Sequence, residues 1–211
     1  MVRGPTGEGA ATVLDKVGDV LRYSFDQKCR FVAIKTAREA GFKNAILSIN
    51  FMPRAVYEPE LCIKSTLDAV SQFGFPIEQL MFEVSELEKA DDHKHIAYIF
   101  KAYKKMGFRT AIDDFGAGNS GLSLLADFVP DVIKLDRVLV DGISESKVKR
   151  IIVKNLLQLS ADLGVEVIAE GIEAFTDLEF LRSEGVRYIQ GFLLGRPTFE
   201  KLVPADWSCF Y

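Results

Sequence analysis

Two adjacent aspartates, Asp113 and Asp114, close an apolar run and precede a glycine-rich loop in the stretch AIDDFGAGNSGLSLL, residues 111–125. Like charges repel each other, and burying two carboxylates is costly unless a cation satisfies them. The pair therefore suggests a site for one or two divalent metal ions. Taken alone, it could equally be the N-cap of a helix and its neighbour.

Other polar side chains occur at comparable places, near the ends of apolar runs. They are Asn50, Glu83, Lys134, Glu170 and Gln190. Carboxylate and amide oxygens suit Mg²⁺ or Mn²⁺ better than zinc, so the metal candidates are Asn50, Glu83, Asp113, Asp114 and Glu170. Two such ions about 4 Å apart can activate water and hold a phosphodiester for in-line displacement.

Lys134 interrupts an apolar strand and would hold the attacking water or neutralise a phosphate oxygen. Each of these residues also has an ordinary interpretation. A single glutamate at a strand end is usually solvated, and a lysine on a strand is usually an edge residue with its ammonium in water. Only their shared position at strand ends favours a site.

The elements that position these side chains follow from the apolar periodicity. Helices are expected at about 26–40, 59–73, 90–106, 145–163 and 175–184, and they stop at Gly41, Gly74, Gly107, Gly164 and Gly185. A shorter helix is expected at 119–127. The intervening strands are AILSIN, LMFEVSE, RTAIDDFG, VIKLD, EVIAEGIE and VRYIQGFLLG.

Strands that alternate with helices pair in parallel, which leaves a doubly wound sheet or a closed barrel. A polar residue at the end of every strand favours the barrel, because a barrel gathers residues from all of its strands. We therefore expect a TIM-like (β/α)8 barrel in a single domain, residues 1–211. Six strands are visible and eight are needed, so the first two are expected before residue 1.

Composition limits the partners and the compartment. The net charge is −4, and lysines and arginines are spread along the chain, which argues against a nucleic-acid polymer or a membrane surface as partner. Cys29, Cys62 and Cys209 fit neither a disulfide framework nor a zinc site, and we expect reduced, mostly buried thiols. The chain has no membrane-length apolar run and no signal peptide, so a cytoplasmic location is expected.

Two further patterns are set aside. His93 and His95, in DDHKH, stand two residues apart on an expected helix and therefore face different directions, as in a solvated helix start. The loop FGAGNSG lacks the lysine of a P-loop. We expect a mobile loop beside the metals, in which Gly116, Gly118 and Gly121 allow unusual backbone angles.

In order, the motifs LSINFMP, FEVSE, AIDDFGAGNSGLSLL, VIKLD, VIAEGIE and YIQGFLLGRP resemble the EAL-domain family of cyclic-di-GMP phosphodiesterases. The resemblance implies a variant TIM barrel that hydrolyses cyclic di-GMP to linear pGpG with two Mg²⁺ or Mn²⁺ ions.

The same resemblance assigns roles to individual residues. The residues that match metal ligands are Asn50, Glu83, Asp113, Asp114 and Glu170. The residues that match catalytic positions are Lys134, Glu170 and Asp114. Arg3, Gln190 and Pro197 match substrate-binding positions. Glu86 matches the anchor of the loop after the aspartates, and Glu173 is a supporting residue near it.

The sequence departs from the family pattern in two places. After Asn50 the family continues with leucine, serine and proline, whereas this chain has Phe51, Met52 and Pro53, as in EAL domains attached to blue-light flavin sensors. The signature Glu-Ala-Leu would lie before Met1, with Arg3 as the arginine that follows it. An EAL domain without its first one or two strands is expected to have unpaired edges, which invite self-association or instability, and to bind one metal weakly. A homodimer is the expected assembly.

Three functions remain open at this point. The first is a cyclic-di-GMP phosphodiesterase, impaired if the signature glutamate is absent, with an upstream sensor domain in the parent protein. The second is a non-catalytic signalling module that binds cyclic di-GMP or a protein. The third is a metal-dependent barrel that abstracts a proton from a carbon acid, where acidic ligands and a lysine base also sit at strand ends.

Overall fold

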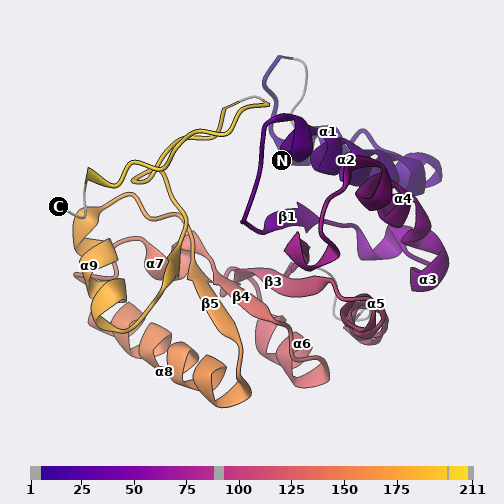
Figure 1. The fold of residues 1–211 in the computed structure, drawn as a ribbon. Coiled ribbons are helices and arrows are strands. Elements are labelled where there is room, and N and C mark those ends of the chain that lie inside the picture. Colours follow the sequence, from indigo (N-terminus) through magenta and orange to yellow (C-terminus); the bar gives the residue numbers. More distant parts are fainter. Residues whose placement is uncertain (1–5, 88–92, 199, 209–211) are drawn as a thin grey trace.

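The computed structural model describes residues 6–87, 93–198 and 200–208, so Arg3 and Cys209 lie outside the described residues. A single six-stranded sheet runs through the molecule in the order β1-β2-β3-β4-β5-β6, and all neighbouring strands are parallel. The strands are β1 (Leu47–Asn50), β2 (Leu80–Ser85), β3 (Arg109–Phe115), β4 (Val132–Leu135), β5 (Glu166–Ala169) and β6 (Tyr188–Ile189). The sheet curls into an open half-barrel with helices along its outer side (Figure 1).

The six expected strands are thus confirmed, and so is their parallel pairing. Within the part of the chain that the structure describes, β1 and β6 each pair on one side only, so both ends of the sheet are open edges. Several strands are shorter than expected: the run 186–195 forms only the two residues of β6, the run 166–173 only the four residues of β5, and the run 45–50 only the four residues of β1. A Cβ atom on Gly191 would lie 2.0 Å from the carbonyl oxygen of Ile172, so the backbone there packs directly against the segment after β5.

The helices are α1 (Ala10–Leu14), α2 (Asp19–Glu39), α3 (Pro59–Cys62), α4 (Lys64–Phe73), α5 (His93–Lys105), α6 (Gly121–Asp127), α7 (Arg137–Val140), α8 (Lys147–Leu163) and α9 (Phe175–Ser183). The described residues also form 3₁₀ turns at Pro53–Ala55 and Ile77–Gln79. Gly74 and Gly164 end α4 and α8 in the left-handed conformation, as their positions in the sequence predict.

Some helices differ from expectation for identifiable reasons. The helix expected at 26–40 begins at Asp19, because its first turns expose Val20 and Leu21 and so carry no buried stripe that a pattern could detect. The helix expected at 59–73 is two helices that meet at Ile63. The short helices α1 and α7 were not expected.

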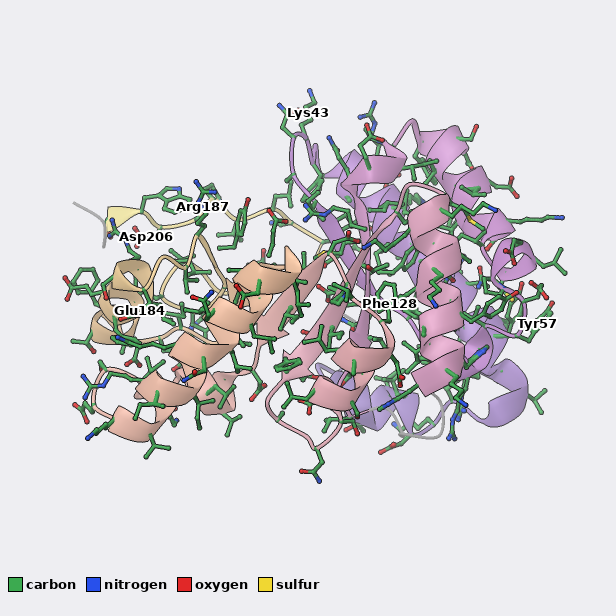
Figure 2. The ribbon with its side chains drawn as sticks, turned by 90° about the horizontal axis from the view of Figure 1, so that it is seen from below. Lys43, Tyr57, Phe128, Glu184, Arg187 and Asp206 are labelled. Atoms are coloured by element: carbon green, nitrogen blue, oxygen red, sulfur yellow. The ribbon has the colours of Figure 1, made fainter. Side chains whose placement is uncertain are left out.

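The two faces of the sheet have different environments. Alternate strand residues such as Ile49, Phe82, Val84, Ile112 and Ile133 join the main core under the helices. Figure 2 shows Phe128 between α5 and α6, where its ring lies 4.9 Å from that of Phe100. The opposite, concave face carries a small separate cluster of Met81, Ala111, Val132 and Ile168. Side chains two residues further along each strand lie on the same face, and they therefore emerge above this cluster, toward the carboxyl ends of the strands.

No helix among the described residues is long and apolar enough to cross a membrane. Of the cysteines, Cys62 is buried and Cys29 is partly buried, and both are free thiols. Burial raises the pKa of the Cys29 thiol, which keeps it protonated and unreactive at neutral pH.

Candidate metal and phosphodiester site

Side-chain alternation along the strands builds the floor and the rim of the candidate site. Glu83 lies two residues beyond Met81 and therefore shares its concave face, as do Asp113 with Ala111 and Lys134 with Val132. Parallel strands end at the same edge of the sheet, so these polar side chains rise together above the apolar cluster. The site therefore sits at the carboxyl ends of the strands, the position that barrel enzymes use.

Alternation alone would send Asp113 and Asp114 to opposite faces of β3. The pairing register between β3 and β4 shifts between Ile112 and Phe115, so both aspartates stand opposite the single residue Lys134. Asp114 has φ of 55°, a left-handed conformation that is rare for a residue other than glycine. This bulge brings both carboxylates into one site, and carboxylate oxygens of Asp113, Asp114 and Glu170 lie within 4.8 Å of one another.

Lys134 stands in the middle of the carboxylates. Its Nζ atom lies 2.7 Å from Glu170, 2.8 Å from Asp113 and 3.1 Å from Glu83. All four side chains are largely withdrawn from solvent, with exposed fractions between 3% and 14%. One ammonium group therefore faces three carboxylates at contact distance, and the fourth, Asp114, adds to the excess negative charge.

Hydrogen bonds from neighbouring polar side chains orient the carboxylates of Glu83 and Asp114. The Ser48 hydroxyl donates to Oε1 of Glu83, and the Asn50 amide donates to Oε2 of the same residue at 3.3 Å. The Ser85 hydroxyl donates to Oδ2 of Asp114 at 2.9 Å. The two serines were not expected from the sequence. Their spacing could have identified them, since each lies two residues from a predicted ligand on the same strand face.

The electrostatics of the site reflect its surplus of carboxylates. Burial raises the pKa of Glu83 and of Asp114, and the charge of Asp113 raises both further. Burial likewise raises the pKa of Glu170 to about 7, against the opposing effect of Lys134. For Lys134, burial acts to lower the pKa, but the charges of Glu83, Asp113 and Glu170 raise it above its ordinary value. The lysine thus stays cationic, and further positive charge would be favourable here.

Glu86 is buried at the base of the loop that follows the aspartates. Its carboxylate accepts the backbone N–H groups of Gly116 at 2.5 Å, Gly118 at 3.3 Å, Ser120 at 3.0 Å and Gly121 at 2.7 Å. Backbone groups from four residues of the loop thus converge on the carboxylate of one side chain.

The glycines of this loop serve a different purpose from the one expected. Only Gly116 has a positive φ, of 100°. A Cβ atom on Gly121 would lie 2.9 Å from the Glu86 carboxyl carbon, and one on Gly118 would lie 3.0 Å from Leu87. Gly118 and Gly121 are needed for close approach rather than for unusual backbone angles.

The remaining predicted residues lie around this centre. Gln190 directly follows β6; its backbone N–H donates to the carbonyl oxygen of Ala169 at 2.8 Å, and the residue lines a hollow of about 420 Å³ together with Arg187 and Tyr188. Pro197 is exposed on the irregular segment after β6. Glu173, in the turn after β5, pairs with Arg137 at the start of α7 at 2.8 Å. Arg3 lies outside the described residues.

The two histidines differ from the solvated helix start that the sequence suggested. His93 is buried, with Nδ1 3.7 Å from a carboxylate oxygen of Asp127 on α6. His95 is partly buried and its Nε2 lies 3.2 Å from the carbonyl oxygen of Pro53. The prediction was wrong for His93 because helix α6 packs over the start of α5, which a local pattern cannot reveal.

Comparison with known proteins identifies several relatives. The family model of the EAL domain matches residues 14–197. A standalone versatile EAL protein from Vibrio cholerae O395, solved in its c-di-GMP bound form, is 43% identical with a TM-score of 0.94, over 100% of this chain and 89% of that one. The manganese and cy-diGMP complex of Klebsiella pneumoniae BlrP1 is 35% identical with a TM-score of 0.87, over 95% of this chain and 51% of that one.

Among curated sequences, the cyclic di-GMP phosphodiesterase PdeR of Escherichia coli K12 is 30% identical over 162 residues, which is 76% of this chain and 24% of that protein. The chain spans about a fifth to a half of the length of the first curated relatives that it matches. The similarity to these longer proteins therefore concerns one of their domains.

Proposed function

Because the chain belongs to the EAL-domain family, we propose that it hydrolyses cyclic di-GMP to linear pGpG with the help of Mg²⁺ or Mn²⁺. The observation that carries this proposal is the cluster of four carboxylates around Lys134 at the carboxyl ends of the strands. Structural relatives bound to c-di-GMP, one of them with manganese, support the same substrate and cofactor class.

The donor set fits a hard divalent cation. Oxygen atoms of Asn50, Glu83, Asp113, Asp114 and Glu170 would hold one or two such ions. Burial raises the pKa of Glu83, Asp114 and Glu170, the charge of Asp113 raises each further, and a bound cation would favour their charged forms. When bound, the metal supplies Lewis-acid activation of water and charge neutralisation at the phosphodiester.

The chain's own residues then divide the work. The high pKa of Lys134 means that it carries its proton throughout, so it acts as a cation that orients the attacking water or a phosphoryl oxygen. The water proton must pass to a carboxylate, and Asp114 and Glu170 are the candidates. Attack forms the new P–O bond, the bond to the 3′ oxygen breaks, and that oxygen takes a proton to leave as a hydroxyl group.

Gln190 is the described residue that we assign to the nucleotide. It directly follows β6, at the carboxyl end of that strand, and lines a hollow with Tyr188 and Arg187. We propose that its amide contacts the guanine or phosphate of the substrate, while Pro197 and Arg3 keep the substrate-binding roles that the resemblance implies.

Incubation with cyclic di-GMP and Mn²⁺, followed by chromatography, tests this function. We expect pGpG from the wild-type chain and a loss of about a hundredfold or more for Asp113→Asn, because the variant removes a carboxylate that would hold the metal, and with it the charge neutralisation that the metal would supply. If the chain is a module that only binds, calorimetry will show that it binds cyclic di-GMP without metal, and chromatography will show no product. That result would overturn the phosphodiesterase and support the non-catalytic alternative, whereas turnover of a carboxylate substrate instead would support carbon-acid chemistry.

A further inference from the structure

A buried ion pair lies on α2, outside the cluster of site residues. The Arg30 guanidinium is fully buried and its NH2 atom lies 2.7 Å from Oδ2 of Asp26, one helical turn earlier. Asp26 is itself only 3% exposed. Desolvating two charges costs several kcal/mol and apolar residues of similar volume would often be at least as stable, so stability alone is a weak explanation for this pair.

Aromatic rings enclose the arginine. Its guanidinium carbon lies 5.0 Å from the ring centroid of Phe82, 5.6 Å from that of Phe51 and 6.0 Å from that of Tyr103. The Tyr103 hydroxyl accepts a hydrogen bond from NH1 at 3.0 Å. Arg30 therefore has a fixed orientation, and it fixes that of Asp26 in turn.

Asp26 reaches the segment that carries a predicted metal ligand. Its Oδ1 atom accepts the backbone N–H of Met52 at 3.0 Å, two residues after Asn50. The intervening Phe51 donates its backbone N–H to the carbonyl oxygen of Glu83 at 3.2 Å and stacks beside Arg30. The chain leaving β1 is thus held by β2 on one side and by α2 on the other.

Asn50 needs such support because β1 is an edge strand within the described sheet. It pairs with β2 only, and Asn50 is exposed at its last position. Among the described residues no strand pairs with the other edge of β1, so the contacts of Phe51 and Met52, which follow Asn50, help to decide where its amide lies.

We propose that Asp26 is a positioning residue, which acts through Met52 to hold the Asn50 amide against Glu83, and that Arg30 and Phe51 lock Asp26 in this role. The same contact gives a physical meaning to the departure from the family motif: Phe51, in place of leucine, supplies a ring against the buried guanidinium. The consequence for metal binding rests on the proposed function, but the position of Asn50 does not.

The test uses a variant that keeps the interior packed. Asp26→Leu combined with Arg30→Met replaces the ion pair by apolar groups, an exchange that buried pairs often tolerate in stability, and removes the acceptor for Met52. Asp177→Asn is the matched control, because Asp177 is also 3% exposed and accepts backbone N–H groups, from Gly142 and Ser144, away from the site.

The first measurement is the side-chain NH2 signal pair of Asn50 in a proton–nitrogen correlation spectrum of the metal-free protein. We expect this pair to move toward free-amide positions in the Asp26→Leu/Arg30→Met variant and to stay in place in the control. An unchanged Asn50 signal in a folded double variant would overturn the proposal, whether or not the protein binds metal.

The second measurement is Mn²⁺ affinity by electron paramagnetic resonance. We expect the double variant to bind Mn²⁺ about tenfold more weakly, as is typical when a residue that orients a metal ligand is lost. In a chain that already carries Asn50→Ala, the double substitution should not weaken Mn²⁺ binding any further. If the losses in Mn²⁺ affinity from Asn50→Ala and from the double substitution add in full, Asp26 does not act through Asn50, and this part of the proposal is overturned. If the wild-type chain binds no Mn²⁺, the proposed function fails, and the Asn50 signals still decide the positioning role.

Discussion

The Lys134 ammonium lies 2.7 Å from the Glu170 carboxylate and contacts Asp113 and Glu83 as well, so its charge offsets part of the negative charge of the cluster. A lysine so placed keeps the carboxylates together before any cation arrives. It also competes with that cation, because like charges repel at short range.

Lys134→Met should therefore separate binding from turnover. Removing the ammonium takes away a repulsion of roughly a few kcal/mol at contact distance, so we expect Mn²⁺ affinity to rise at least tenfold. Turnover should fall by about a hundredfold or more, because the cation that orients water is lost. Calorimetric Mn²⁺ titration and product chromatography measure the two effects.

Lys104→Met is the control for this variant, since Lys104 pairs with Asp131 at 2.9 Å near the opposite ends of the strands. It should leave Mn²⁺ affinity unchanged. Equal or weaker Mn²⁺ binding by Lys134→Met would contradict the competition.

Glu86→Gln should loosen the loop 116–121. The glutamine has one acceptor oxygen and presents an NH2 group to backbone donors, so some of the four N–H bonds are lost and we expect a loss of about 2–3 kcal/mol in the free energy of unfolding. Amide hydrogen exchange at Gly116 and Gly121 should accelerate. Glu173→Gln, which breaks an exposed pair with Arg137, should cost no more than about 1 kcal/mol and should not change exchange in the loop.

Asp177 should make stability depend on pH in the acid range. Burial acts to raise its pKa, but hydrogen bonds from Ser144 and Gly142 outweigh this and lower it below the ordinary value. A carboxyl with a lowered pKa in the folded state stabilises above its unfolded pKa of about 3.9, and this contribution disappears as the pH falls through the folded pKa.

We therefore expect Asp177→Asn to cost about 1–3 kcal/mol at pH 7 and progressively less below pH 4. Chemical denaturation of both proteins at several pH values measures the difference. A gap that stays constant down to pH 2 would rule out this carboxylate as the source.

Gly191→Ala should destabilise the junction of β5 and β6. The new Cβ atom would lie 2.0 Å from the backbone oxygen of Ile172, and no rotamer change can relieve a clash with backbone. We expect a loss of about 2–4 kcal/mol by thermal or chemical unfolding. Gly18→Ala, where a Cβ atom would meet nothing within 4 Å, should be neutral or slightly stabilising; similar losses in both variants would contradict the packing explanation.

The local pattern was sufficient for much of the fold and of the candidate site. Glycine stops and apolar runs predicted the strands and most helices, because both signals act within a few residues along the chain. The strand-end positions of Glu83, Asp113, Lys134 and Glu170 predicted that they would meet, because parallel strands share one edge. Helix α7 and the first turns of α2 escaped detection since they bury too few side chains to leave a period.

What the sequence by itself determined is which residue types stand on the concave side of each strand, since side-chain alternation is a local property of the backbone. Only the tertiary structure decided that Asp113 and Asp114 share one site, because a register shift against β4 turns Asp114 into a left-handed conformation. It also decided that Lys134 on β4 contacts carboxylates from β2, from β3 and from the segment after β5, and that Asp26 accepts a hydrogen bond from Met52. Such contacts depend on the distance between segments far apart in sequence, and no local pattern contains that distance.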